Sequence, residues 1–348
     1  MVVRAVAFLL SLCGVARAAS AVDGAARNML LPELSGSVGA PLKPVILYHG
    51  LIGDAEDMQG IADLVMETFP GTVATSLPLF EGPARSMTPL PLQIAGVKDA
   101  IRALVAANQS LYADGYNLVC KSQGGLVCRA VIETMDDHNV DTFISLAAPQ
   151  MGCYGLGYVE HSLTFRGVSP QQLAELLGLS GVGAVLGAVL IRVFEAVTSA
   201  STTTMAYDET HGMRLIELLS PLQLWRDWHR LDDFYRLSPI LPSHTEDANA
   251  TMRDNFLRLR RAVFNVGSGP PFEGGIEPWQ TGIFGTYDAA GNLVPLENQT
   301  WYSGADTIGL REMNETGRLV LNTPPNVTHE DWTNDTAIIR QWVLPYLQ

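Results

Sequence analysis

The chain of 348 residues is 47% hydrophobic and 17% charged, which is the composition of a globular protein. Its 32 Gly and 20 Pro are too few for a collagen-like or low-complexity chain, and its hydrophobic content excludes intrinsic disorder. The 22 Lys and Arg against 36 Asp and Glu give a net charge of −14. We therefore expect no nucleic-acid partner, because phosphate binding needs clustered basic side chains. The length fits one large domain or two smaller ones.

The N-terminus has the pattern of a secretory signal peptide. Arg4 supplies the basic start, residues 5–15 supply an apolar segment, and Ala16-Arg17-Ala18 supplies the small residues that precede cleavage. The apolar segment is shorter than the roughly twenty residues that an uncleaved transmembrane helix needs. We predict removal of residues 1–18, a mature chain of residues 19–348, and entry into the secretory pathway for lysosomal delivery or secretion.

Six Asn-x-Ser/Thr sequons predict a glycoprotein. A single sequon is weak evidence, but six of them beside a cleavable signal fit a chain that enters the secretory pathway. The sequons begin at Asn108, Asn249, Asn298, Asn314, Asn326 and Asn334.

Cysteine and histidine usage predicts neither a disulfide-rich nor a metal-binding protein. Three of the four Cys remain after signal cleavage, and this odd number allows at most one disulfide. Cys120 and Cys128 flank a serine-containing turn and could lie near each other, whereas Cys153 begins the insertion described below. The sequence leaves the pairing open. The seven His show no metal-ligand spacing, so we expect no metal and no cofactor.

Strands and helices alternate along much of the chain. Short apolar, β-branched runs predict buried strands at residues 44–48, 72–79, 116–120, 141–146, 262–266 and 318–321. Amphipathic patterns predict helices at residues 57–69, 92–107, 126–135 and 332–347. This alternation predicts an α/β fold with a mostly parallel sheet and right-handed crossovers.

The alternation stops between about residues 151 and 261, where we predict a helical insertion before the last strands. Its most unusual segment is the apolar, Gly-rich run of residues 176–191. This run contains Ser180 and is followed by Arg192 and Glu195, so we interpret it as a buried or lid helix and not as a membrane span. The Trp, His, Asp and Tyr cluster of residues 227–237 is interpreted as packing within the insertion.

Ser122 is the candidate catalytic nucleophile. It lies in a Lys-Ser-Gln-Gly-Gly turn between a predicted strand and a predicted helix, which is the setting of a nucleophile elbow. In the usual pattern, Gly-x-Ser-x-Gly, a glycine stands where this chain has Cys120. Gly124 and Gly125 allow the helix to pack closely behind the serine.

A serine nucleophile needs a histidine base and, in most enzymes, a carboxylate, and on this type of sheet they follow in the order Ser, acid, His. His329 is the candidate base because it lies in a loop between the last strand and the last helix. The loop of residues 267–278 offers Glu273 and Glu277 as the acid, and their spacing does not decide between them. The other histidines after Ser122 are expected to pack or lie at the surface; they are His138, His161, His211, His229 and His244.

Two backbone N–H groups are candidates for an oxyanion hole. The turn His49-Gly50-Leu51 directly follows the first predicted strand and can direct an N–H group toward the serine. The second donor in such sites is the N–H of the residue after the nucleophile, here Gln123.

The chain resembles the palmitoyl-protein thioesterases in four segments: VILYHGLIGD (45–54), SQGGLVCRA (122–130), DDHNVDTFISLAAPQMGCYG (136–155) and FGTYD (284–288). The spacing from Asn255-Phe256-Leu257 to Pro278-Trp279-Gln280 is similar too, and the resemblance covers nearly the whole mature chain. It fails mainly at about residues 157–226, where the apolar run has no counterpart.

The resemblance implies an α/β-hydrolase fold and a role for each site residue. Ser122 matches the family's nucleophile, His329 its general base, and the N–H groups of Leu51 and Gln123 its oxyanion hole. Glu273 stands where the family has its catalytic Asp, with Glu277 as the alternative. Lys121, beside the nucleophile, is a further departure, and its contacts are not evident from the sequence.

The resemblance further implies an enzyme that hydrolyses long-chain fatty-acyl thioesters of S-acylated proteins or acyl-CoA, and we expect a monomer. These enzymes hold the acyl chain in a hydrophobic groove beneath late-inserted helices, which makes residues 176–191 the candidate lid. An oxygen-ester lipase or esterase with the same triad is the main alternative, since the triad alone does not distinguish the two esters. A hydrolase-fold binding protein without turnover is the third.

Overall fold

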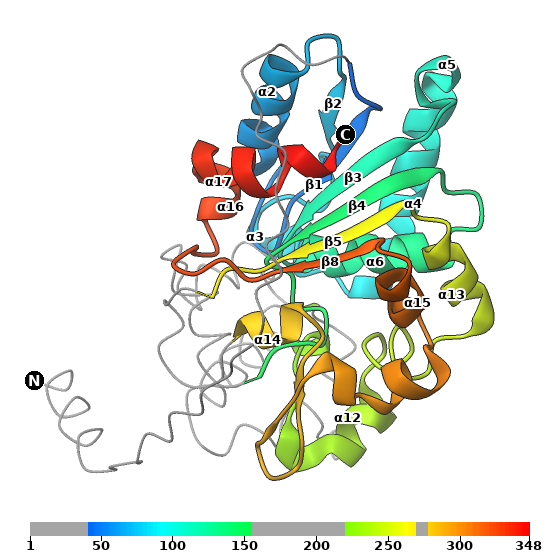
Figure 1. Cartoon of the computed structure of the whole chain (residues 1–348), viewed down its shortest axis with the longest axis vertical. Helices are drawn as coiled ribbons and strands as arrows, with labels where there is room; N and C mark the ends of the chain where they lie inside the picture. Colours follow the sequence, from blue (N-terminus) through cyan, green and yellow to red (C-terminus); the bar gives the residue numbers. More distant parts are fainter. Residues whose placement is uncertain (1–40, 155–219, 269–277) are drawn as a thin grey trace, which may run out of the picture. The chain divides into compact units, whose positions relative to one another are not determined.

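The computed structural model describes residues 41–154, 220–268 and 278–348. Its centre is a six-stranded sheet in the order β2-β1-β3-β4-β5-β8, with every neighbouring pair parallel (Figure 1). The strands are β1 (Val45–Tyr48), β2 (Ala74–Ser76), β3 (Tyr116–Lys121), β4 (Val140–Leu146), β5 (Arg261–Asn265) and β8 (Leu319–Asn322). Each of the six predicted strands corresponds to one of these.

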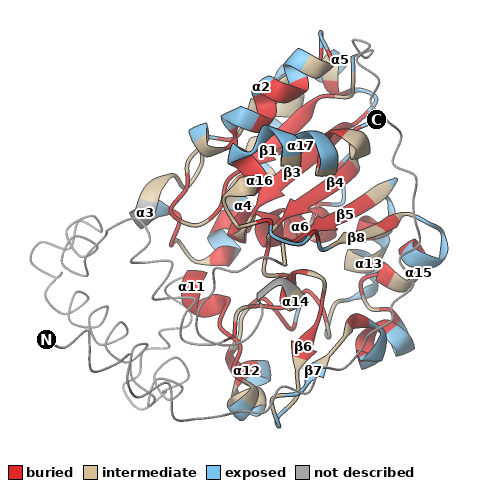
Figure 2. Ribbon diagram, turned by 60° about the vertical axis from the view of Figure 1, so that its left-hand side comes forward, coloured by how far each residue is buried: buried red, intermediate tan, exposed pale blue. Residues whose placement is uncertain are grey.

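Helices cover both faces of the sheet. One face packs against α4 (Leu90–Ala107), α6 (Gln123–Thr134) and α13 (Ala250–Leu257). The other packs against α2 (Gln59–Thr68), α16 (Asp331–Asn334) and α17 (Thr336–Trp342). The four inner strands β1, β3, β4 and β5 are therefore largely buried, the edge strands β2 and β8 are mostly half-buried, and the outer surfaces of the helices are exposed (Figure 2). Burial on both faces explains the apolar runs within the inner strands, such as VILY in β1.

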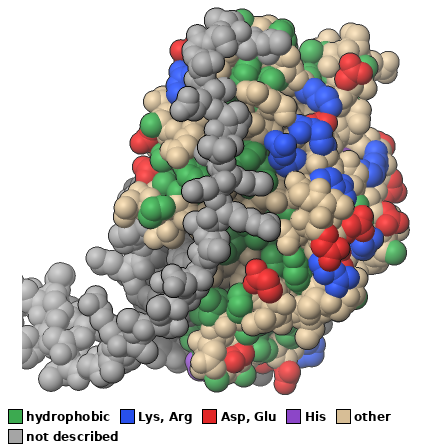
Figure 3. Space-filling view, in the orientation of Figure 1, with side chains coloured by type: hydrophobic (Ala, Val, Ile, Leu, Met, Phe, Trp, Pro, Cys, Tyr) green, Lys and Arg blue, Asp and Glu red, His purple; other side chains and the backbone are tan. Residues whose placement is uncertain are grey.

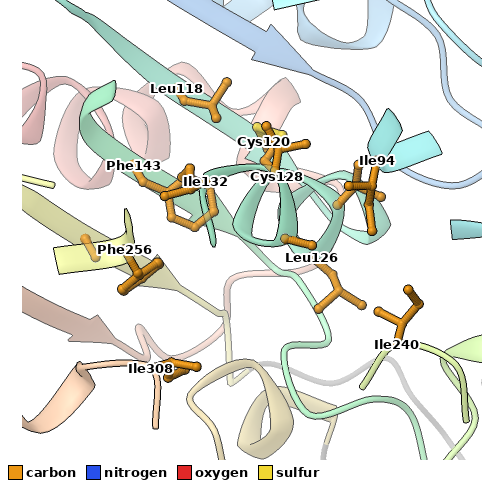
Figure 4. Packing of buried hydrophobic residues seen from close by; sticks show 14 of the residues in the cluster. Ile94, Leu118, Cys120, Leu126, Cys128, Ile132, Phe143, Ile240, Phe256 and Ile308 are labelled. Atoms are coloured by element: carbon orange, nitrogen blue, oxygen red, sulfur yellow. A yellow bond between two sulfur atoms is a disulfide. The ribbon is translucent and has the colours of Figure 1, made fainter. Parts of the chain in front are cut away.

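Side chains of β3 alternate between the two layers, as the strand period of two requires. Leu118 and Cys120 pack with Phe143 and Ile132 in the layer of α4 and α6 (Figure 4). Val119 packs in the opposite layer, beneath α2 and α17. Lys121, two residues after Val119, therefore belongs to that second layer too.

Two predicted elements are shorter than expected or divided. The strand predicted at residues 72–79 is limited to β2, because Pro78 has no N–H group with which to continue a ladder. The helix predicted at residues 332–347 is divided into α16, α17 and the 3-10 turn η6 (Leu344–Tyr346). The division falls at Asp335, which has an extended backbone and caps α17 by accepting bonds from the N–H groups of Ala337 and Ile338.

Two long connections, one between β4 and β5 and one between β5 and β8, contain further elements. Between β4 and β5 the described part contains α11 (Ser220–Gln223), η3 (Trp228–Arg230), α12 (Leu231–Leu237) and α13. Residues 155–219, including the apolar run of residues 176–191, lie outside the described residues. Between β5 and β8 lie α14 (Pro278–Gly282), the hairpin of β6 (Thr286–Tyr287) and β7 (Leu293–Val294), and α15 (Leu310–Glu315). The sequence did not predict this hairpin.

Short helical segments join these elements. They are η1 (Glu56–Met58), α3 (Gly82–Arg85), α5 (Gln109–Tyr112), η4 (Leu296–Asn298) and η5 (Trp301–Ala305). With a parallel sheet between two helical layers and a serine turn after the central strand β3, the protein has the predicted α/β-hydrolase fold.

A buried ionic network ties α6 to the described part of the first excursion. Arg129 and Glu133 are fully buried, with Arg129 Nη1 3.0 Å from Glu133 Oε1. His244 Nδ1 lies 2.5 Å from the other Glu133 oxygen, and the His244 carbonyl accepts from Arg129 Nη1 at 2.6 Å. Arg129 thus links the helix behind Ser122 to the segment that carries His244.

Acidic and basic side chains lie side by side over α13 and α15 (Figure 3). Arg253 Nη2 is 2.8 Å from Glu312 Oε2, and Arg318 Nη2 is 3.7 Å from Glu312 Oε1. The face in this view therefore carries mixed charge at that position, and no broad basic surface is formed there.

Candidate active site

The backbone at Ser122 forms a strained turn at the carboxyl end of β3. Ser122 has φ 55° and ψ −133°, a combination that costs energy in any residue with a side chain. The turn is held because the Ser122 N–H donates to the Leu146 carbonyl at 2.7 Å and the Ser122 carbonyl accepts from Gly125 at 2.9 Å. Helix α6 begins at the next residue, Gln123. This strand-turn-helix geometry is that of a nucleophile elbow.

Glycines allow the elbow to pack closely against its neighbours. A Cβ atom on Gly124 would lie 2.1 Å from the His49 carbonyl oxygen. A Cβ atom on Gly125 would lie 2.6 Å from the Cβ of Ala148 and 2.7 Å from Ser145 Oγ. The first turn of α6 therefore packs against two segments. Gly124 contacts the residue after β1, and Gly125 contacts the end of β4 and the residues that follow it.

Gly50 brings the turn after β1 into contact with the nucleophile candidate. A Cβ atom at Gly50 would lie 2.6 Å from Ser122 Cβ and 3.3 Å from Ser122 Oγ. Within the same turn the Ile52 N–H donates to Ser86 Oγ at 2.8 Å, and the Gly53 N–H donates to the Gly50 carbonyl at 3.2 Å. These bonds fix the backbone around Leu51 beside Ser122.

Adding a methyl group at Gly50 should disturb the reaction at Ser122. We expect Gly50→Ala to lower kcat/KM about 100-fold, because its Cβ displaces Ser122 or the Leu51 turn and small displacements at a reacting centre are costly. Gly304→Ala is the matched control, since nothing lies within 4 Å of a Cβ placed there. Steady-state hydrolysis of an acyl thioester measures both; full activity of Gly50→Ala would contradict the contact.

A disulfide joins Cys120 to Cys128 across the elbow, which settles the pairing that the sequence left open. Both cysteines are fully buried, and their Cα atoms are 6.7 Å apart (Figure 4). Cys120 is the residue in the first-glycine position, so the departure from Gly-x-Ser-x-Gly supplies one half of this bond. The disulfide links the strand before Ser122 to the helix after it.

Removing this disulfide should destabilise the fold. The closed loop is short, with a sequence separation of 8. The chain-entropy relation then gives a loss of about 2–3 kcal/mol in the free energy of unfolding for the Cys120→Ala/Cys128→Ala variant. Denaturant unfolding followed by circular dichroism measures it, with Cys153→Ala as the control outside this disulfide. A double variant as stable as the wild type would contradict the prediction.

The loop that carries His329 follows β8, and the structure ties it to the neighbouring loop after β5. A Cβ atom on Gly267 would lie 1.9 Å from the Val327 carbonyl oxygen, so the two loops are in contact. The Ser268 N–H donates to the Pro324 carbonyl at 3.0 Å. The Thr328 N–H donates to Asp331 Oδ2 at 2.7 Å, which closes the loop around His329.

The candidate acids Glu273 and Glu277 lie outside the described residues. The described start of their loop, Gly267 and Ser268, lies against the His329 loop. The loop predicted to carry the acid therefore begins beside the loop predicted to carry the base.

Lys121, whose contacts the sequence did not reveal, is buried and ion-paired. Its side chain is 8% exposed, and Nζ lies 2.8 Å from Glu330 Oε2 and 3.1 Å from Thr333 Oγ1. The residue before the nucleophile candidate therefore contacts the residue after His329. This contact brings together chain segments that are 209 positions apart.

The remaining described histidines have other surroundings. His49 is buried with its ring nitrogens 2.8 Å from the Gly50 and Leu79 carbonyl oxygens. His244 pairs with Glu133, and His229 is exposed beside Trp228. His138 is buried with Nε2 3.0 Å from the Asn255 carbonyl oxygen. His161 and His211 lie outside the described residues.

Burial lowers the pKa of His138 from 6.5 to about 4. As the pH falls below 6.5, His138 takes up a proton in the unfolded chain but stays neutral in the folded protein. The free energy of unfolding therefore decreases between about pH 6.5 and pH 4. Between pH 7 and pH 5 this group should cost roughly 2 kcal/mol in the free energy of unfolding.

Replacing His138 tests this pH dependence. In His138→Gln, the loss of unfolding free energy between pH 7 and pH 5 should be smaller than in the wild type by that amount. Denaturant titrations at the two pH values measure the difference. His229→Gln is the control because His229 is exposed. An unchanged pH dependence in His138→Gln would show that the ring is not neutral when buried.

The described ranges show further features that bear on the sequence predictions. The six sequon asparagines are all exposed at the surface. In these ranges no helix has the length and apolar character that crossing a membrane requires. The same parts of the chain hold no group of three or more His, Cys, Asp or Glu arranged to bind a metal ion.

Comparisons with known proteins show which proteins the whole chain is similar to. Residues 44–329 match the family described as palmitoyl protein thioesterase. The chain is 30% identical to lysosomal thioesterase PPT2-B of Xenopus laevis, over 92% of this chain and 98% of the relative. It is 32% identical to the rat lysosomal thioesterase PPT2, over 92% of each chain. The human PPT2 is 32% identical over 88% of this chain and 89% of its own length.

Proposed function

Because the chain belongs to the palmitoyl protein thioesterase family, as the sequence resemblance predicted, we propose that it cleaves long-chain fatty-acyl thioesters through Ser122. The family membership makes the chain a thioester hydrolase; the triad and the acyl group are the proposal. The observation that carries it is the strained Ser122 elbow, with Gly50 against its hydroxyl.

The proposed reaction has two steps. His329 takes the proton of the Ser122 hydroxyl as Oγ attacks the thioester carbonyl, and Glu273 holds the imidazole and stabilises its charged form. The tetrahedral intermediate collapses, the C–S bond breaks, and the thiol leaves with the proton from His329. Water, deprotonated by His329, then attacks the acyl-serine ester, the C–O bond to Ser122 breaks, His329 returns the proton to Oγ, and the fatty acid leaves. These proposed steps need only groups of the protein and water.

The oxyanion hole is proposed to be the N–H groups of Leu51 and Gln123. Gln123 begins α6, so its N–H has no acceptor within the helix and benefits from the helix dipole. Leu51 lies in the turn that Gly50 brings against Ser122. Each such donor is worth about 3 kcal/mol in the transition state.

The acyl chain needs a dry binding surface, and we propose that the helical insertion supplies it. Burial of a long acyl chain contributes about 0.8 kcal/mol for each methylene, part of which holds the thioester carbonyl at Ser122. The candidate lid, residues 176–191, lies outside the described residues, and its composition is the support for this role.

A lysosomal location is proposed from the names of the relatives and from the predicted signal peptide.

The six exposed sequon asparagines support a glycosylated chain. Digestion of the secreted protein with an N-glycosidase should lower its apparent mass; an unchanged mass would remove this support.

Hydrolysis of matched esters tests the proposed function. The wild type should release free thiol from palmitoyl-CoA faster than it hydrolyses an oxygen ester of palmitate, and kcat/KM should fall as the acyl chain is shortened. Preference for the oxygen ester would identify a lipase or esterase. No turnover of either ester by folded protein would support a binding protein.

A further inference from the structure

Lys121 occupies a position where a charge is costly. It is the last residue of β3, and it is 7% exposed. It follows Val119 on the face of the sheet that packs against α2, α16 and α17. A buried ammonium group loses its hydration, and an apolar side chain of similar size would be at least as stable there. Stability alone therefore does not explain why a lysine stands at this position, and we expect a functional role.

The partners of Lys121 indicate that role. Its ammonium group lies 2.8 Å from Glu330 Oε2 and 3.1 Å from Thr333 Oγ1. Glu330 directly follows His329, and Thr333 lies in α16 just beyond it. Two further contacts of the loop lie elsewhere: the Thr328 N–H donates to Asp331 Oδ2 within the loop, and the Val327 carbonyl oxygen lies against Gly267. The Lys121 contacts join the loop to the strand that carries Ser122.

The ion pair can fix the positions of the Ser122 and His329 side chains, because each of its members is the chain neighbour of one of them. Adjacent Cα atoms are about 3.8 Å apart, so the pair fixes the backbone within one residue of Ser122 and one residue of His329. Proton transfer between the two side chains needs a separation near hydrogen-bond length. A displacement of about 1 Å at such a centre can reduce the rate about 100-fold.

We propose that Lys121 and Glu330 are positioning residues that hold the imidazole of His329 at the Ser122 hydroxyl. This inference rests on the proposed function, in which Ser122 and His329 carry the reaction. The buried Lys121 side chain contacts Glu330 and Thr333, so the pair acts on the reaction through the loop that carries His329. Loss of the pair therefore lowers the rate of the chemical step and leaves substrate binding nearly intact.

The test is a double-mutant cycle in the full-length enzyme. The variants are Lys121→Met, Glu330→Gln and the double variant, and the readouts are kcat and KM for palmitoyl-CoA and the rate of Ser122 labelling by a fluorophosphonate. We expect each single variant to lower kcat and the labelling rate by 10- to 100-fold, with KM within threefold of the wild type. The double variant should lose little more than the worse single variant.

Two further variants control for folding and for charge. Lys43→Met removes an ion pair between Lys43 and Asp141 at the opposite edge of the sheet and should leave kcat unchanged. The charge-reversed variant Lys121→Glu/Glu330→Lys should recover part of the activity lost by the single variants. If Lys121→Met does not fold, Glu330→Gln decides alone, since the Glu330 side chain is 35% exposed.

Three results would overturn the inference: single variants within twofold of wild-type kcat, losses that simply multiply in the double variant, or losses that appear in KM alone. Ser122→Ala separates this outcome from failure of the proposed function. If Ser122→Ala is inactive while Lys121→Met is fully active, only the positioning role is wrong. If Ser122→Ala retains activity, the proposed function itself is wrong.

Discussion

Ser122→Ala should lower kcat/KM for palmitoyl-CoA by about 10⁴-fold or more. The hydroxyl is the proposed nucleophile, so its loss removes the acyl-enzyme and leaves only catalysis by the oxyanion hole and by binding. The effect is this large because triad members act as a unit, and the remaining base has no serine to deprotonate. Thiol release at saturating and limiting substrate gives kcat and kcat/KM separately.

The control for this variant is Ser145→Ala on the neighbouring strand β4. Ser145 is buried close to the same elbow, where Gln150 Nε2 donates to its Oγ at 2.9 Å. Removing that hydroxyl should change kcat/KM by less than tenfold. A Ser122→Ala variant that stays within tenfold of the wild type would rule out Ser122 as the nucleophile.

Glu273→Gln should lower kcat by about 10³- to 10⁴-fold, while Glu277→Gln should leave it nearly unchanged. An amide has the size of the carboxylate, but it neither fixes the productive tautomer of His329 nor stabilises the imidazolium. The two residues lie four positions apart in the same loop, so Glu277→Gln is a close chemical control. The comparison is made on kcat at saturating palmitoyl-CoA.

The reverse pattern, with the large loss in Glu277→Gln, would move the acid to Glu277. Retained activity in both variants would show that neither carboxylate completes a triad. Either result leaves the nucleophile assignment intact, because the Ser122 variant tests that independently.

The sheet could be predicted from sequence because its strands are buried on both faces. Runs such as residues 45–48 in β1 are apolar without interruption, which few other elements permit. The turn at Ser122 could be predicted as well, since Ser-Gln-Gly-Gly between a strand and a helix is typical of a nucleophile elbow. The sequence was less informative about where elements end. The cap at Asp335 divides the predicted C-terminal helix, and Pro78 ends the second predicted strand early, although the apolar patterns continue past both residues.

Contacts between distant segments could not be predicted. The sequence shows Lys121 as an unusual residue beside the proposed nucleophile, but its partner Glu330 is 209 positions away. The link from Arg129 to His244 spans 115 positions. The disulfide was one of several open pairings among three cysteines, and the close packing of β3 and α6 selects Cys120 and Cys128. Local patterns specify elements, whereas these contacts depend on how the layers come together.

The central proposal, an acyl-enzyme on Ser122, is tested most directly by locating the covalent adduct of a fluorophosphonate. The enzyme is labelled with and without excess palmitoyl-CoA, digested, and examined by tandem mass spectrometry. We expect one modified peptide with the phosphonate on Ser122, and labelling that is slowed by the palmitoyl thioester. An adduct on another residue, or no adduct on a preparation that hydrolyses the thioester, would contradict the proposed nucleophile.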